Sequence, residues 1–204
     1  MIVNQINPDT LNAEIRIRRS RFICQLHKVT NIEEAKNYIS TVSRQYRDAT
    51  HNCWAYILGS KADIFHSSDA GEPSGTAGKP ILSVLRKHDL TNIVSVVTRY
   101  YGGVKLGVRG LIEAYSQSVE EALSTGSIEQ LIELVRAEIN TGYDFGEILK
   151  YKIQELGAVI ENIEYGSGIK MQVSIPAEKW KDLDIYLQEM EKSGKLGFSC
   201  DHSE

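Results

Sequence analysis

Two glycine-dense segments, residues 68–80 and 98–110, constrain the fold of this 204-residue chain more than any other feature. Each segment follows a pattern typical of a β-strand and precedes an apolar stripe with helical spacing. Each also carries a lysine where the helix is expected to begin, Lys79 in the first and Lys105 in the second. Because glycine adopts turns that other residues resist, the pattern predicts two strand–loop–helix units.

Hydrophobic spacing places the other elements of the N-terminal part. Alternating or apolar patterns predict strands at residues 13–18, 21–27, 51–58 and 62–67. A helical stripe covers residues 32–46, and Thr30 with Glu33 forms a capping-box pattern at its start. Residues 93–98 are a continuous run of β-favouring residues, which predicts a central strand buried on both faces.

After Gly126 the order of the predicted elements changes. We expect strands near residues 131–139, 158–165, 169–175 and 195–200, with helices near 144–156 and 180–190. This β-α-β-β-α-β order is the ferredoxin-like arrangement. The sequence therefore predicts an α+β chain with a two-layer α/β domain at residues 1–135 and a ferredoxin-like domain at residues 136–204.

Composition limits the classes of protein to which the chain can belong. Its hydrophobic content of 42% and charged content of 25% are ordinary for a soluble globular protein, and its longest apolar runs are too short to cross a membrane. No basic-then-apolar leader opens the sequence, so we expect a cytoplasmic protein. The three cysteines lie far apart and show no metal-ligand spacing, so we predict reduced thiols, no metal and no cofactor.

Positive charge is concentrated around the glycine-dense segments, although the net charge is −4. Amides of glycine-rich turns and helix N-termini can bind anions, and lysine, arginine and hydroxyl side chains can add donors. The candidate anion- or nucleic-acid-binding residues are Ser74, Thr76, Lys79, Arg99, Tyr100, Lys105 and Arg109. Trp54, Tyr100 and Tyr101 can stack on bases if they are exposed. The glycine spacing matches neither a Walker loop nor a dinucleotide fingerprint, so ATP and NAD are not predicted.

Other interpretations of the same residues remain open. The glycines can serve only to make tight turns and to let helices pack closely. Asp69 and Glu72 can form a polar pocket for acid–base chemistry or a metal, or Asp69 can accept backbone hydrogen bonds within a turn. His51 and Cys53 share a strand face and could form a nucleophile pair, or a core thiol beside a boundary histidine. The arginines at 16–21 can be a solvated strand face or a phosphate-contact edge.

Several joined motifs between residues 10 and 125 resemble the IMPACT/YigZ family. They are His51-Asn-Cys-Trp-Ala-Tyr, Ser68-Asp-Ala-Gly-Glu-Pro-Ser-Gly-Thr-Ala-Gly-Lys-Pro-Ile-Leu, Thr91-Asn-Ile-Val-Ser-Val-Val-Thr-Arg-Tyr-Tyr-Gly-Gly-Val-Lys-Leu-Gly and Glu14-Ile-Arg-Ile-Arg-Arg-Ser-Arg-Phe-Ile. The resemblance implies an N-terminal domain similar to domain IV of elongation factor G and a C-terminal domain similar to its last domain. The chain departs from the family pattern at Val108 and Arg109, where Ala and Gly are usual, and at Glu113, where Arg is common.

These features lead to three functional hypotheses. The first is a non-enzymatic protein that binds RNA or the ribosome and acts in translation regulation, as the resemblance implies. The second is an enzyme or sensor for a small phosphate-containing ligand that uses Asp69, Glu72 and Ser74. The third is a protein-interaction module with a protein partner.

Overall fold

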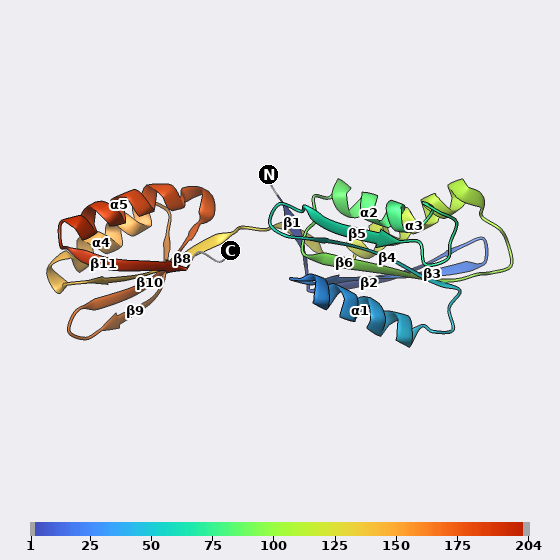
Figure 1. Ribbon diagram of the computed structural model, residues 1–204, viewed down its shortest axis with the longest axis horizontal. Coiled ribbons are helices and arrows are strands. Elements are labelled where there is room, and N and C mark those ends of the chain that lie inside the picture. Colours follow the sequence, from blue (N-terminus) through green and yellow to red (C-terminus); the bar gives the residue numbers. More distant parts are fainter. Residues whose placement is uncertain (1–2, 202–204) are drawn as a thin grey trace. The chain divides into compact units, whose positions relative to one another are not determined.

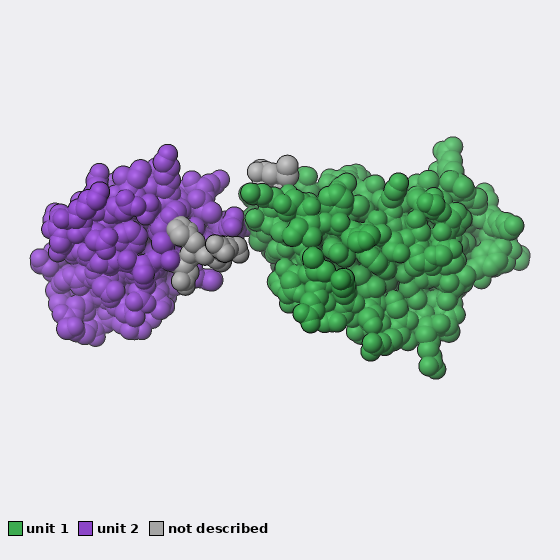
Figure 2. All heavy atoms as spheres, in the orientation of Figure 1, with its two compact units in different colours: residues 1–131 green, residues 132–204 purple. Residues whose placement is uncertain are grey.

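The computed structural model describes residues 3–201 and divides the chain into two compact units (Figure 2). Unit 1 covers residues 1–131 and unit 2 covers residues 132–204. The sequence placed the boundary at residue 135, which falls inside the first strand of unit 2, β8 (Leu134–Thr141).

Unit 1 is built on a five-stranded antiparallel sheet. From edge to edge, its strands are β2 (Thr10–Ile17), β3 (Ser20–Lys28), β6 (Ile93–Tyr100), β4 (His51–Leu58) and β5 (Ile64–Ser68). The strand predicted to be central, β6, is buried from Ile93 to Arg99. A separate two-stranded ribbon pairs β1 (Asn4–Asn7) with β7 (Ser127–Gln130).

Helices cover both faces of this sheet, as Figure 1 shows. One face packs against α1 (Ile32–Gln45), and the other packs against α2 (Gly78–Lys87) and α3 (Gly107–Leu123). The prediction of a two-layer domain was therefore wrong, since unit 1 has three layers. The physical reason lies in β6, where Val94 and Val96 pack in the α1 core and Ile93 and Val97 pack in the opposite core. Both faces of the central strand are apolar, so both need a covering helix.

The first helix begins one residue later than the sequence pattern indicated. Asn31 is the N-cap, and its Oδ1 accepts a hydrogen bond from the Glu34 amide at 2.9 Å. Glu34 Oε2 in turn accepts a hydrogen bond from the backbone amide of Thr30 at 2.7 Å. Asn31 and Glu34 therefore form a variant of the capping box, in which Glu34 bonds to the amide of the residue before the N-cap; the predicted pair was Thr30 and Glu33.

Unit 2 has the ferredoxin-like order of elements that the sequence predicted. Its elements are β8 (Leu134–Thr141), α4 (Tyr143–Glu155), β9 (Val159–Tyr165), β10 (Ile169–Pro176), the 3-10 turn η1 (Ala177–Lys179), α5 (Trp180–Lys192) and β11 (Leu196–Asp201). The sheet order is β11-β8-β10-β9, and both helices lie on one face (Figure 1). Its core is separate from those of unit 1 and includes Ile139, Leu149 and Leu187, all fully buried. Among the helices of the described residues, none is long and apolar enough to span a bilayer.

Separate cores predict separate unfolding transitions, and the chain provides one tryptophan reporter for each unit. Trp54 lies in β4 and Trp180 lies in α5. Truncating Ile139 to alanine leaves a cavity in unit 2 and should cost that unit about 2–5 kcal/mol. We expect urea unfolding followed by Trp180 fluorescence, in a Trp54→Phe background, to shift to lower denaturant.

The matched measurement uses Trp54 fluorescence in a Trp180→Phe background. Ile139→Ala should leave that transition unchanged, because Trp54 reports a core that does not contain Ile139. Equal shifts in both signals would show that the two cores unfold as one cooperative unit.

Candidate nucleic-acid interface

Antiparallel pairing brings four connections of unit 1 to one end of its sheet. They are the β2–β3 turn at residues 18–19, the α1–β4 connection at 46–50, the β5–α2 loop at 69–77 and the β6–α3 loop at 101–106. We call this region the loop end. Figure 1 draws the β2–β3 turn and the β6–α3 loop together there. Both glycine-dense segments of the sequence thus lie at the loop end.

Hydrogen bonds join these connections into one surface. The amide of Gly102 donates to Ser20 Oγ at 3.2 Å, and the amide of Tyr101 donates to Thr50 Oγ1 at 2.9 Å. A Cβ atom on Gly102 would overlap the backbone carbonyl of Arg19. Only glycine permits this approach, so the glycine fixes the β6–α3 loop against the β2–β3 turn.

The β5–α2 loop is organised by the carboxylate of Asp69. Its Oδ2 accepts the amide of Gly75 at 2.8 Å, and its Oδ1 accepts the amides of Ala77 at 3.0 Å and Gly78 at 2.8 Å. Burial alone would raise the pKa of Asp69, but these three amides and the charge of Lys79 outweigh it and lower the pKa below its ordinary value.

This geometry changes the interpretation of the first glycine-dense segment. Amides at the start of α2 were expected to face a bound phosphate, but those of Ala77 and Gly78 face the chain's own carboxylate. Asp69 occupies the position that an external anion would take at a helix N-terminus. Of the alternatives for Asp69, the structure therefore agrees with the one in which its carboxylate accepts backbone hydrogen bonds within a turn.

A buried ion pair holds the same loop to the sheet. Arg99 Nη1 lies 2.6 Å from Glu72 Oε1, and their side chains are only 6% and 3% exposed. The Tyr115 hydroxyl donates to the same Glu72 oxygen at 2.9 Å. Arg99 Nη2 also reaches Ser20 Oγ at 3.4 Å. Arg99 was a candidate phosphate ligand, but in the structure its charge is directed inward to Glu72.

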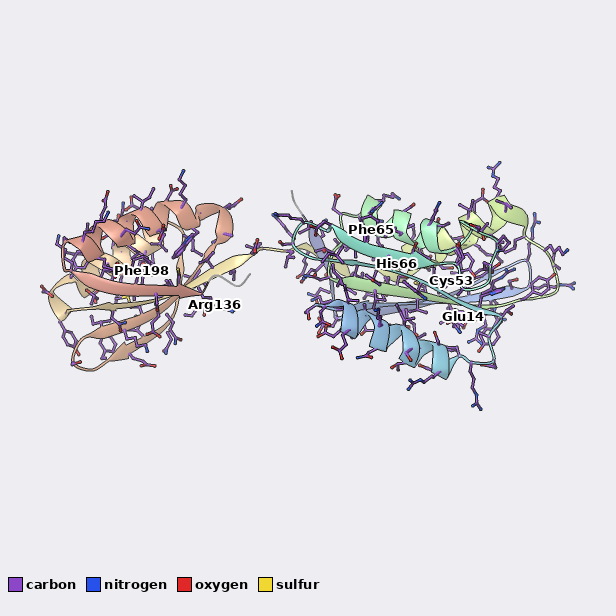
Figure 3. The ribbon with its side chains drawn as sticks, viewed as in Figure 1. Glu14, Cys53, Phe65, His66, Arg136 and Phe198 are labelled. Atoms are coloured by element: carbon purple, nitrogen blue, oxygen red, sulfur yellow. The ribbon has the colours of Figure 1, made fainter. Side chains whose placement is uncertain are left out.

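The strand pair His51 and Cys53 also faces this loop. The Cys53 thiol, labelled in Figure 3, lies 2.9 Å from the Asp69 carbonyl oxygen and 3.3 Å from the Tyr115 hydroxyl. Burial raises the pKa of this thiol to about 12, so it is not a nucleophile near neutral pH. His51 Nδ1 lies 3.0 Å from the Ala70 carbonyl oxygen, which only accepts, so Nδ1 carries the proton.

The other predicted residues divide into exposed and internal groups. Ser74, Lys79, Lys105 and Arg109 are exposed at or beside the loop end. Thr76 is buried, and its hydroxyl donates to the Pro73 carbonyl at 2.7 Å.

The predicted stacking residues differ in their accessibility. The Tyr100 hydroxyl donates to Asp48 at 3.0 Å, and Trp54 stacks on Tyr56 with ring centroids 5.9 Å apart. Tyr101 is 44% exposed, and the Arg99 guanidinium lies over its ring at 5.4 Å from the centroid.

The arginine cluster at residues 16–21 is divided by the fold. Arg16 and Arg21 contact Glu14 on β2 at 3.4 Å and 2.9 Å. Arg18 and Arg19 form the β2–β3 turn and are exposed at the loop end. Sequence reasoning did not distinguish these two pairs. The available signal was the break in the alternation at Arg19-Ser20, which lies one residue beyond the turn that the structure has at residues 18–19.

The structure adds two further observations about this surface. Arg47 is exposed in the α1–β4 connection, which the sequence did not connect with the glycine loops. Within residues 3–201, no group of three or more His, Cys, Asp or Glu side chains could hold a metal ion. Asp69 and Glu72 instead take part in hydrogen bonds and the ion pair described above.

Comparison with known proteins places the chain among its relatives. A family model described as the Impact N-terminal domain matches residues 18–123. The IMPACT family member YvyE of Bacillus subtilis is 37% identical over 180 residues, which cover 87% of this chain and 82% of that protein. The IMPACT family member YigZ of Escherichia coli is 32% identical over 178 residues, covering 86% and 87%.

A solved structure described as that of a hypothetical protein matches the whole of both chains. Its TM-score is 0.65 and its sequence identity is 29%. This likeness supports the two-domain mixed α/β fold. The predicted similarity of the two units to domains of elongation factor G stays a prediction.

The buried ion pair gives a testable contrast with an exposed one. Arg99→Met should destabilise unit 1 by about 3–5 kcal/mol, because it leaves the Glu72 carboxylate buried without its partner. Glu72→Met combined with Arg99→Met should recover much of that loss. The control is Arg109→Met, which removes an exposed pair with Glu113 and should change the free energy of unfolding little. Equal effects of Arg99→Met and Arg109→Met in urea unfolding would contradict this account.

Asp69 makes the stability of unit 1 depend on pH. Its folded-state pKa is lowered, so its contribution is present above the unfolded pKa of about 3.9 and is lost as pH falls through the folded value. Asp69→Asn should therefore lower the urea midpoint at neutral pH, and the difference from the wild type should shrink as the pH falls below the unfolded pKa of about 3.9. Asp9→Asn, at an exposed pair with Lys28, serves as the control. If the difference in urea midpoint between the wild type and Asp69→Asn stayed constant with pH, the Asp69 carboxylate could not be its source.

Proposed function

The chain belongs to the IMPACT family, and from that premise we propose that it is a non-enzymatic protein that binds RNA or the ribosome. It would act in the cytoplasm, in translation regulation. The proposal rests on the loop end of unit 1, where exposed cationic side chains gather on connections held rigidly to one another. The single observation that carries it is this convergence of positive charge.

The charges at the loop end come from three of its connections and from the first turns of α2 and α3. Their exposed members are Arg18, Arg19, Arg47, Lys79, Lys105 and Arg109. Helix α3 begins at this end with no acidic residue in its first turn, so its N-terminal partial positive charge adds to the same field, whereas the first amides of α2 donate to Asp69. Among the acidic side chains here, Asp69 and Glu72 face inward and Glu113 pairs with Arg109 at 2.8 Å, while the exposed Asp48 accepts a hydrogen bond from Tyr100.

A surface of this kind suits a polyanion, because phosphate contacts need charge and donors but no deep cavity. Tyr101 lies exposed on the same surface and offers a ring on which a base can stack. The internal network supports binding rather than catalysis, since the Cys53 thiol has a raised pKa and both loop carboxylates hold the fold together. A protein partner in translation is the alternative that the family resemblance keeps open.

Binding of a single-stranded RNA at several salt concentrations tests the proposal. With three to five phosphate contacts, log K should fall with log salt at a slope of roughly −2 to −4. Lys79→Gln with Lys105→Gln should weaken binding for all RNA sequences and reduce the slope by about one per lost contact. Fluorescence anisotropy of a labelled oligonucleotide measures both quantities.

The control variant is Lys36→Gln, which removes one exposed charge from α1 away from the loop end. It should leave the slope and affinity nearly unchanged. Absence of affinity at low salt, or affinity that does not change with salt, would exclude a phosphate-binding surface. A protein partner that co-purifies after nuclease treatment would then support the interaction-module alternative.

A further inference from the structure

A cavity of about 340 Å³ lies between the end of β2 and the start of α3. Its inner wall is apolar and includes Ile17, Leu106 and Ala114, whereas Arg18 and Arg109 line its mouth. Glu113 and Gln117 continue the exposed wall along two turns of α3. Its volume is at the lower end of the range for small-molecule sites, about 300–1,000 Å³.

The two arginines reach this cavity from separate elements. Arg18 belongs to the two-residue β2–β3 turn, in which Arg18 and Arg19 have φ values of 44° and 70°. A two-residue hairpin turn with both φ values positive favours Asn-Gly, and bulky side chains adopt it at some cost. The chain nevertheless keeps arginine at both positions, and the first of them lines the cavity.

The start of α3 supplies further donors at the same place. Leu106 is its N-cap, no side chain caps the helix, and its first turn contains no acidic residue. Arg109 pairs with Glu113, but this pair is 93% and 63% exposed and is therefore weak. A phosphate can displace Glu113 from Arg109 at little cost and gain a charge-assisted bidentate contact.

We infer that this cavity binds one nucleotide of a single-stranded RNA. The phosphate lies between Arg18 and Arg109, and the base lies against the apolar wall of Ile17, Leu106 and Ala114. Gln117 stands roughly 12 Å along α3 from Arg109, far enough to meet the edge of that base. This inference rests on the proposed function and deepens it, because it names an unstacked nucleotide as the unit recognised.

The chain offers variants with matched charge. Arg18→Asn removes the arginine while keeping a residue that tolerates positive φ, so the turn should persist. Arg109→Gln with Glu113→Gln removes the exposed pair without changing net charge. Arg16→Gln is the control, since Arg16 is exposed near the end of the same strand but does not line the cavity. Circular dichroism and the thermal midpoint confirm that each variant is folded.

Fluorescence anisotropy with labelled oligo(A), oligo(C) and oligo(U) measures the outcome. Arg18→Asn and the Arg109/Glu113 double variant should each weaken binding about ten-fold, and Arg16→Gln should weaken it less than about three-fold. Gln117→Ala should reduce the difference among the three oligonucleotides while leaving the salt slope unchanged. Single strands should bind more tightly than a duplex, whose bases are stacked and cannot enter the cavity.

The results separate this inference from the proposed function. RNA binding that is salt-dependent but equally sensitive to Arg16→Gln and Arg18→Asn overturns the cavity and leaves the general surface intact. A second outcome is that RNA does not bind but free AMP, CMP or UMP does, and that the Arg109/Glu113 double variant abolishes this binding. That result assigns the cavity to a soluble nucleotide and overturns RNA as its ligand. Absence of both overturns the cavity and the proposed function together.

Discussion

The buried contact between Glu72 and Arg99 is the interaction on which the arrangement of the loop end depends. It joins the β5–α2 loop to the central strand β6, and the Tyr115 hydroxyl extends it to α3. Because an unpaired charge at this depth is costly, the two side chains keep the loop in one position. The exposed cations around it are therefore displayed on a rigid frame.

Much of the fold could be predicted from local patterns, whereas the site could not. The alternation in β2 and the continuous run in β6 follow from side-chain periodicity, which is a local property. The partner of Arg99 is 27 residues away and lies in a loop, so no periodicity relates it to Glu72. The glycine-dense motif correctly predicted a loop before α2, but the amides of this loop were expected to bind an external anion. Asp69, inside the motif itself, binds them instead.

Two departures from the expected family pattern lie next to each other on α3. Arg109 replaces a usual glycine and Glu113 replaces a common arginine, and the two form an i, i+4 pair on the wall of the cavity. The two residues carry opposite charges, so they neutralise each other on the surface of α3. A lone Arg109 would raise the local charge, and the pair moderates it. The sequence showed both departures, but only the helix geometry shows that they are neighbours.

The close approach of Gly102 to Arg19 has a consequence for how this surface can vary. The backbone of the β6–α3 loop contacts the β2–β3 turn at one point, so the lengths of these two connections are tied to each other. An extra residue in the turn would displace the loop, and one before Gly102 would displace the turn. Beyond that point the constraint is of another kind: a side chain at Gly103 or Gly107 would meet nothing within 4 Å, but φ values of 82° and 73° favour glycine at both positions. Substitution at these two glycines is therefore limited by backbone conformation, whereas substitution at Gly102 is limited by the atoms of the neighbouring turn.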